Sequence, residues 1–103
     1  MKIDVVNGWI QEHQTLKNLV VPKIICKDGY MFSVQASKYH YCTPRTANGF
    51  PYTHFEIGYP SGREETLMGY AEDKDRPTDT VYGYVPLKTV LEVIEAHGGM
   101  KEE

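Results

Sequence analysis

The chain has 103 residues, a formal net charge of −3 and two cysteines, and these values limit what it can be. The length is typical of a single domain, residues 1–103, and a hydrophobic fraction of 41% is enough to build a core. The basic residues are scattered along the chain, which argues against duplex nucleic acid as a partner, because that binding depends on neutralising phosphates. No apolar leader begins the sequence and no window approaches the roughly 20 apolar residues of a membrane span. We therefore expect a cytoplasmic protein with reduced thiols and no membrane contact.

The N-terminal segment predicts a small β-hairpin. Residues 3–6 form a short apolar run rich in β-branched side chains, and Asn7-Gly8 follows as a tight-turn signal. Trp9 and Ile10 then resume the apolar pattern on the far side of that turn.

A second hairpin is predicted over residues 23–35. Asp28-Gly29 is another tight-turn signal, and apolar side chains alternate with more polar ones over residues 30–35. Pro22 cannot donate to a ladder, so we place it at a sheet edge or between two short strands.

The middle of the chain predicts a turn and a strand. Residues 36–41 fit one helical turn capped by Ser37, and Thr43-Pro44 ends it, because a residue before proline avoids the helical region. Residues 52–59 alternate between apolar and polar side chains and predict a half-buried strand.

Three further segments precede the C-terminus. Residues 63–70 fit a short helix or an irregular excursion, and residues 71–80 form a polar, charged surface loop. Residues 80–85 predict a strand with Tyr82 and Tyr84 on one face. Period-2 logic leaves open whether that face is solvated or packs on the helix that follows.

The C-terminal segment predicts an amphipathic helix. Pro86 suits its first turn, Gly98-Gly99 supplies the stop, and His97 lies in the last turn, where a cation suits the helix dipole. Its apolar stripe has helical spacing and consists of Leu87, Val90, Leu91 and Ile94. The sequence thus predicts an α+β fold, a small antiparallel sheet of about four to six strands with one C-terminal helix.

The densest collection of polar side chains lies in residues 33–45, SVQASKYHYCTPR. An arginine there can grip a phosphate or carboxylate with two hydrogen bonds, and tyrosine rings can stack on a base. The residues expected to bind such a ligand are Gln35, His40, Tyr41, Thr43, Arg45, Tyr82 and Tyr84. The alternative for Arg45 is a structural ion pair with an acidic side chain such as Glu56.

Catalytic and metal-binding constellations are incomplete. His40 and Cys42 share a face in an extended chain, but no Cys-x-x-Cys or His-x-x-x-His spacing completes a zinc site. A small buried Cys42 beside a locally bonded His40 is the simpler interpretation. The acidic residues 72–79 lack the spacing of a calcium loop. We predict no catalytic residue, metal or cofactor.

Residues 33–45 and 77–99, joined by FEIGYPS at residues 55–61, resemble small accessory proteins encoded by tailed phages and prophages. The resemblance covers roughly residues 30–99 and carries no catalytic motif. It implies a role against host defence, either by capturing a nucleotide second messenger or by blocking an effector protein.

Three hypotheses follow. The first is a non-enzymatic counter-defence protein that sequesters a small nucleotide-type host immune signal, as a homodimer if the site lies between protomers. The second is a protein inhibitor of a host defence nuclease, comparable to anti-CRISPR proteins, which uses residues 72–79 and the tyrosines as its interface. The third is a small hydrolase based on His40 and a carboxylate.

Overall fold

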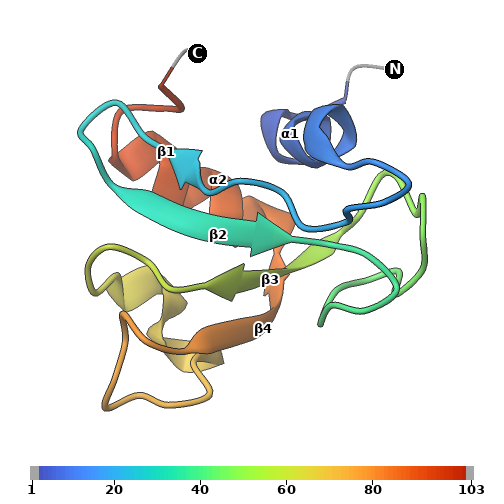
Figure 1. The fold of residues 1–103 in the computed structure, drawn as a ribbon. Coiled ribbons are helices and arrows are strands. Elements are labelled where there is room, and N and C mark those ends of the chain that lie inside the picture. Colours follow the sequence, from blue (N-terminus) through green and yellow to red (C-terminus); the bar gives the residue numbers. More distant parts are fainter. Residues whose placement is uncertain (1–2, 102–103) are drawn as a thin grey trace.

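The computed structural model describes residues 3–101 and contains a four-stranded antiparallel sheet with helices beside it (Figure 1). The strands are β1 (Ile24–Ile25), β2 (Met31–Gln35), β3 (His54–Gly58) and β4 (Val81–Pro86), in the spatial order β1-β2-β3-β4. The helices are α1 (Val5–His13), the 3₁₀ helix η1 (Glu65–Tyr70) and α2 (Leu87–Ala96). The predicted α+β class is therefore confirmed. In the described part of the chain, no helix is long and apolar enough to cross a membrane.

One apolar core joins the two α-helices to the sheet. α1 contacts α2 and β2, and α2 contacts β4. The predicted alternation holds in β2 and β3, whose core residues lie two positions apart along each strand. The buried side chains of these elements include Phe32, Val34, Phe55, Ile57, Tyr82, Val85, Val6, Ile10, Val90, Val93 and Ile94.

The predicted N-terminal hairpin is wrong, because α1 occupies that segment. Asp4 caps the helix, and its carboxylate accepts the backbone N–H of Asn7 at 2.8 Å. Asn7 is fully buried, and its amide is held by tertiary hydrogen bonds instead of by a turn. Val6 and Ile10, four residues apart, face the core. Capping and tertiary contacts thus outweigh the turn preference of Asn7-Gly8.

The predicted hairpin over residues 23–35 is confirmed. Its strands pair in antiparallel register, with Ile24 opposite Phe32. Gly29 has a φ of 93°, a value that favours glycine, so the turn depends on this residue. β1 has only two residues, because Pro22 interrupts the strand on its N-terminal side.

A β-bulge in β4 overturns the prediction that Tyr82 and Tyr84 share a face. Phe55 of β3 pairs with Val85, whereas Ile57 pairs with Tyr82, so β4 carries one extra residue between these pairs. Tyr84 adopts a φ of 54° there. Because the extra residue breaks the two-residue period, Tyr82 is fully buried while Tyr84 is exposed.

The remaining short segments follow the sequence in part. Residues 36–41 form one hydrogen-bonded turn without a helix, and Ser37 caps it by accepting the N–H of Tyr39 at 3.0 Å. η1 supplies the short helix expected within residues 63–70. The predicted loop at residues 71–80 is present, and most of its side chains are exposed.

The C-terminal helix is confirmed, and the chain beyond it completes the sheet. Gly98 and Gly99 have φ values of 89° and 92° and end the helix. The chain then runs antiparallel to the outer edge of β1, where Met100 forms a bridge with Cys26. This segment therefore covers the backbone of an otherwise open edge strand.

Candidate functional site

Gln35, one of the predicted ligand contacts, completes the sheet instead. Its side chain is only 6% exposed. Its Oε1 accepts the N–H of Val21 at 2.9 Å, and its Nε2 donates to the C=O of Val21 at 2.9 Å and to Ser33 Oγ at 2.9 Å. The side-chain amide thus replaces the ladder bonds that Pro22 interrupts. Gln35 is therefore buried and hydrogen-bonded within the fold.

Tyr82 is likewise occupied within the core. Its ring is fully buried, and its hydroxyl donates to the C=O of Pro77 at 2.5 Å. Burial raises the pKa of its phenol. Since no face of this ring reaches solvent, Tyr82 offers no stacking platform, and of the two β4 tyrosines only Tyr84 has an exposed ring.

The segment that carries most of the predicted site residues folds back onto the start of β3. Thr43 accepts the N–H of Thr53 at 2.7 Å and donates its own N–H to His54 O at 3.1 Å. Cys42 lies beneath and is buried, and its thiol donates to Ser37 O at 3.1 Å. The side chain of Thr43 is exposed, while its backbone is held by the hydrogen bonds to Thr53 and His54.

His40 and Cys42 do not form a nucleophile–base pair. The His40 Nδ1 lies 2.6 Å from Ser37 Oγ, and this serine hydroxyl already accepts the N–H of Tyr39. Burial lowers the pKa of His40, the negative charge of Glu56 opposes this, and the positive charge of Arg45 adds to it. Burial also raises the pKa of the Cys42 thiol, which favours its unreactive protonated form.

Tyr41, Arg45 and Tyr84 come together on the surface, and we refer to these residues as the tyrosine surface. The N–H of Tyr84 donates to Tyr41 O at 3.1 Å, which ties the loop to the bulge of β4. The ring centroids of these tyrosines are 5.9 Å apart with planes tilted by 37°. The Arg45 Cζ lies 5.3 Å from the centre of the Tyr41 ring, a cation–π contact.

Both tyrosine rings on this surface are accessible. Tyr41 is 39% exposed and Tyr84 is 46% exposed. Glu56 orients the loop by accepting the N–H of Tyr41 at 3.1 Å, so this carboxylate contacts the loop backbone and forms no ion pair with Arg45. Among residues 3–101, the Arg45 guanidinium forms no ion pair. A guanidinium beside exposed aromatic rings can bind an anionic group attached to a planar ring.

A cluster that the sequence did not predict surrounds His97. Its Nδ1 lies 2.6 Å from Asp28 Oδ2, its Nε2 lies 2.9 Å from Glu64 Oε1, and its ring stacks on Tyr30 at 4.0 Å. Burial alone would lower the pKa of His97, but the hydrogen bonds and charges of both carboxylates outweigh it and raise the pKa. The hydrogen bond from the Tyr30 N–H lowers the pKa of Asp28, and His97 adds to this. The cluster fastens the end of α2 to the β1–β2 turn and to η1.

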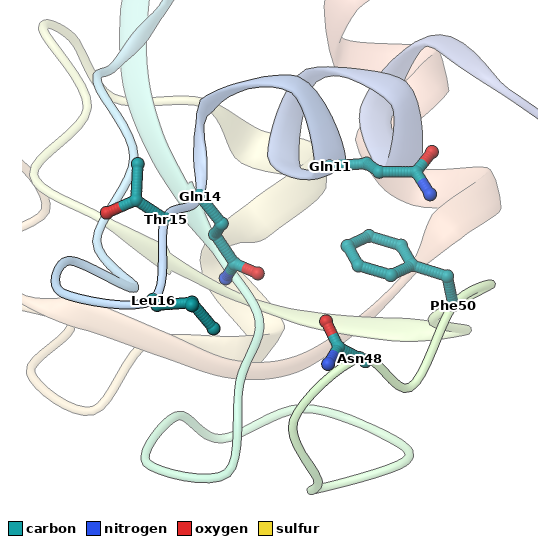
Figure 2. Close-up of a pocket in the computed structure, with 6 residues that line it drawn as sticks. All are labelled: Gln11, Gln14, Thr15, Leu16, Asn48 and Phe50. Carbon is teal, nitrogen blue, oxygen red and sulfur yellow. The ribbon is translucent and has the colours of Figure 1, made fainter.

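A second feature that the sequence did not predict is a hollow of about 600 Å³ between the end of α1 and the loop before β3. Its lining is uncharged and consists of Gln11, Gln14, Thr15, Leu16, Asn48 and Phe50 (Figure 2). The lining residues come from segments more than thirty positions apart in the sequence, so no local motif could have revealed it.

Comparison of the chain with protein-family models, with curated proteins and with solved structures finds no match. The resemblance to phage accessory proteins therefore remains an expectation from the sequence, and any functional argument depends on the geometry of the surface.

Proposed function

We propose that the protein binds a nucleotide-type ligand on the tyrosine surface without transforming it. The observation that carries this proposal is that the exposed Tyr41 and Tyr84 rings lie beside the Arg45 guanidinium, which forms no ion pair in the described part of the chain. An aromatic ring stacked on a base contributes about 1–3 kcal/mol, and an arginine forks onto a phosphate with charge-assisted hydrogen bonds. His40 and Thr43 lie on the same loop and supply polar groups beside it.

The shape of this surface favours binding over catalysis. Tyr41 and Tyr84 are open to solvent, and the neighbouring His40 and Cys42 are engaged by Ser37. Efficient acid–base chemistry requires a group free to exchange a proton with substrate. A sequestering protein instead requires enclosure, which a second protomer lying over the tyrosine surface would provide. Following the phage resemblance, we propose a host signalling nucleotide as the ligand.

An inhibitor of a host protein is the second candidate, supported by the position of the acidic loop. The N–H of Glu72 donates to Val81 O at 3.0 Å, so this loop begins beside β4, the strand that carries Tyr84. Asp73 and Asp75 are exposed on it. A partner with a basic groove could contact these carboxylates together with the tyrosine surface.

The test compares nucleotide binding by the wild type with binding by Arg45→Ala and Tyr84→Gly, using calorimetry and native mass spectrometry. Glycine suits the φ of 54° at Tyr84, so the second variant removes the ring and keeps the bulge. Each variant should weaken binding about tenfold or more, which corresponds to about 1.4 kcal/mol. Arg63→Ala is the matched control, because Arg63 pairs with Glu65 outside the surface.

No binding of cyclic, linear or ADP-ribose-type nucleotides by the wild type would refute the proposal. A protein partner retained by Arg45→Ala and lost when Asp73 and Asp75 are changed to lysine would establish the second candidate instead.

A further inference from the structure

The hollow beside α1 is lined by uncharged side chains, and some of their polar groups have no partner within residues 3–101. Its volume of about 600 Å³ is within the range of small-molecule sites. Within residues 3–101, the side-chain amides of Gln11 and Asn48 have no hydrogen-bond partner. Both amides carry a donor and an acceptor in one plane. The ring of Phe50 and the fully exposed side chain of Leu16 supply its apolar contacts (Figure 2).

Gln14 presents a fixed acceptor to this hollow. Its Nε2 donates to Leu19 O at 2.9 Å and to Ala36 O at 2.6 Å, which uses both amide protons. These bonds define the orientation of the amide and leave Oε1 without a partner in the described part of the chain. Figure 2 shows that this oxygen is turned towards Asn48 and Phe50. A ligand that covers this oxygen would gain a hydrogen bond by offering a donor at this position.

Hydrogen bonds hold α1, which forms one wall of the hollow, against the loop before β3, which forms the other. On α1, the Asn7 side chain accepts the N–H of Tyr52 at 2.7 Å and donates to the C=O of Tyr52 at 3.0 Å. The Tyr52 hydroxyl then donates to Thr46 O at 2.6 Å and accepts the N–H of Gly49 at 3.1 Å. A Cβ at Gly49 would lie 2.7 Å from a side-chain atom of Pro44, which shows how closely this loop is packed. The site is therefore largely formed before a ligand arrives.

We propose that this hollow binds an uncharged, planar, nitrogen-containing heterocycle of the nucleoside class, separately from the tyrosine surface. A ring N–H or exocyclic amine of such a base would donate to Gln14 Oε1. The planar amides of Gln11 and Asn48 match the adjacent donors and acceptors on a base edge, and Phe50 can stack on its face. No lining side chain carries a charge, so a phosphate adds nothing to recognition here.

The experiment is an NMR titration of the full chain with adenosine, cytidine and a neutral monosaccharide. A nucleoside should cause saturable shifts in the side-chain amide signals of Gln11 and Asn48. Gln11→Ala and Asn48→Gly should each weaken binding about tenfold. Both changes suit the fold, because Gln11 is exposed on a helix and Asn48 has a φ of 54°. Arg45→Ala should leave nucleoside binding unchanged, which separates this site from the proposed nucleotide surface.

Absence of saturable shifts up to about 10 mM nucleoside, an affinity too weak for a built site, would overturn the proposal. Equal shifts with the monosaccharide, or undiminished binding by both hollow variants, would also overturn it.

Discussion

Replacement of Asn7 by alanine should destabilise the fold far more than an ordinary change on a helix. Asn7 is 0% exposed and is the only partner, among residues 3–101, of both the N–H and the C=O of Tyr52. Alanine would remove the amide from both backbone groups at once. Both backbone groups would then be buried without a protein partner, because Asn7 and Tyr52 are almost completely shielded from solvent.

The expected loss of stability can be estimated from the N–H and C=O groups of Tyr52. Each buried polar group that loses its partner costs about 1–3 kcal/mol, so the pair costs about 2–6 kcal/mol. The better helix propensity of alanine recovers about 0.6 kcal/mol. We therefore expect Asn7→Ala to lower the free energy of unfolding by about 1.5–5 kcal/mol, a large share of the stability of a small domain.

Equilibrium unfolding in urea measures this change, with the slope m compared between variants. Gln11→Ala is the matched control, because Gln11 is exposed on the same helix and should change stability by less than about 0.5 kcal/mol. A loss below about 1 kcal/mol for Asn7→Ala, with m unchanged, would refute the reasoning that the Asn7–Tyr52 pair fastens α1 to the loop.

Two further predictions concern His97 and Gln35. The pKa of His97 in the folded protein is raised above its ordinary value of 6.5. Protonated His97 therefore stabilises the fold fully below pH 6.5, and this stabilisation is lost as the pH rises through the raised pKa. Unfolding free energies measured from about pH 6 to about pH 9 should therefore fall in the wild type and fall less in His97→Gln; equal slopes would contradict the paired contacts with Asp28 and Glu64. Gln35→Leu should lower stability by about 2–4 kcal/mol, because it orphans both backbone groups of Val21, and chemical denaturation measures it. If Gln35→Leu instead keeps its stability and loses nucleotide binding, the structural role is contradicted and Gln35 belongs to the ligand-binding site.

The sequence predicted those elements whose local pattern and tertiary environment agree. The hairpin at Asp28-Gly29 needs only a local turn, and α2 needs only an apolar stripe and a glycine stop. The N-terminal helix was missed, because its Asn7 is fixed by Tyr52, 45 positions away. No local preference can report such a contact.

The candidate site was predicted in part for the same reason. The polar segment around Tyr41 and Arg45 was visible in the sequence, because its composition is unlike that of a core. The bulge of β4 was not, since one inserted residue reverses which side chains face the core without changing the alternating pattern. The sequence therefore placed Tyr82 beside Tyr84, whereas the structure places Tyr41 there.

The coverage of both sheet edges restricts how two copies of the chain can associate. Met100 forms a bridge with Cys26 at the end of β1. Along β4, the N–H of Tyr84 donates to Tyr41 O and Val81 O accepts the N–H of Glu72. Within residues 3–101, neither edge offers a continuous row of free N–H and C=O groups, which disfavours extension of the sheet by a strand of a second chain. A homodimer would instead meet through side chains on a face of the molecule. Its affinity would then be set by exposed groups such as Tyr84, and ligand and partner would share the same contacts.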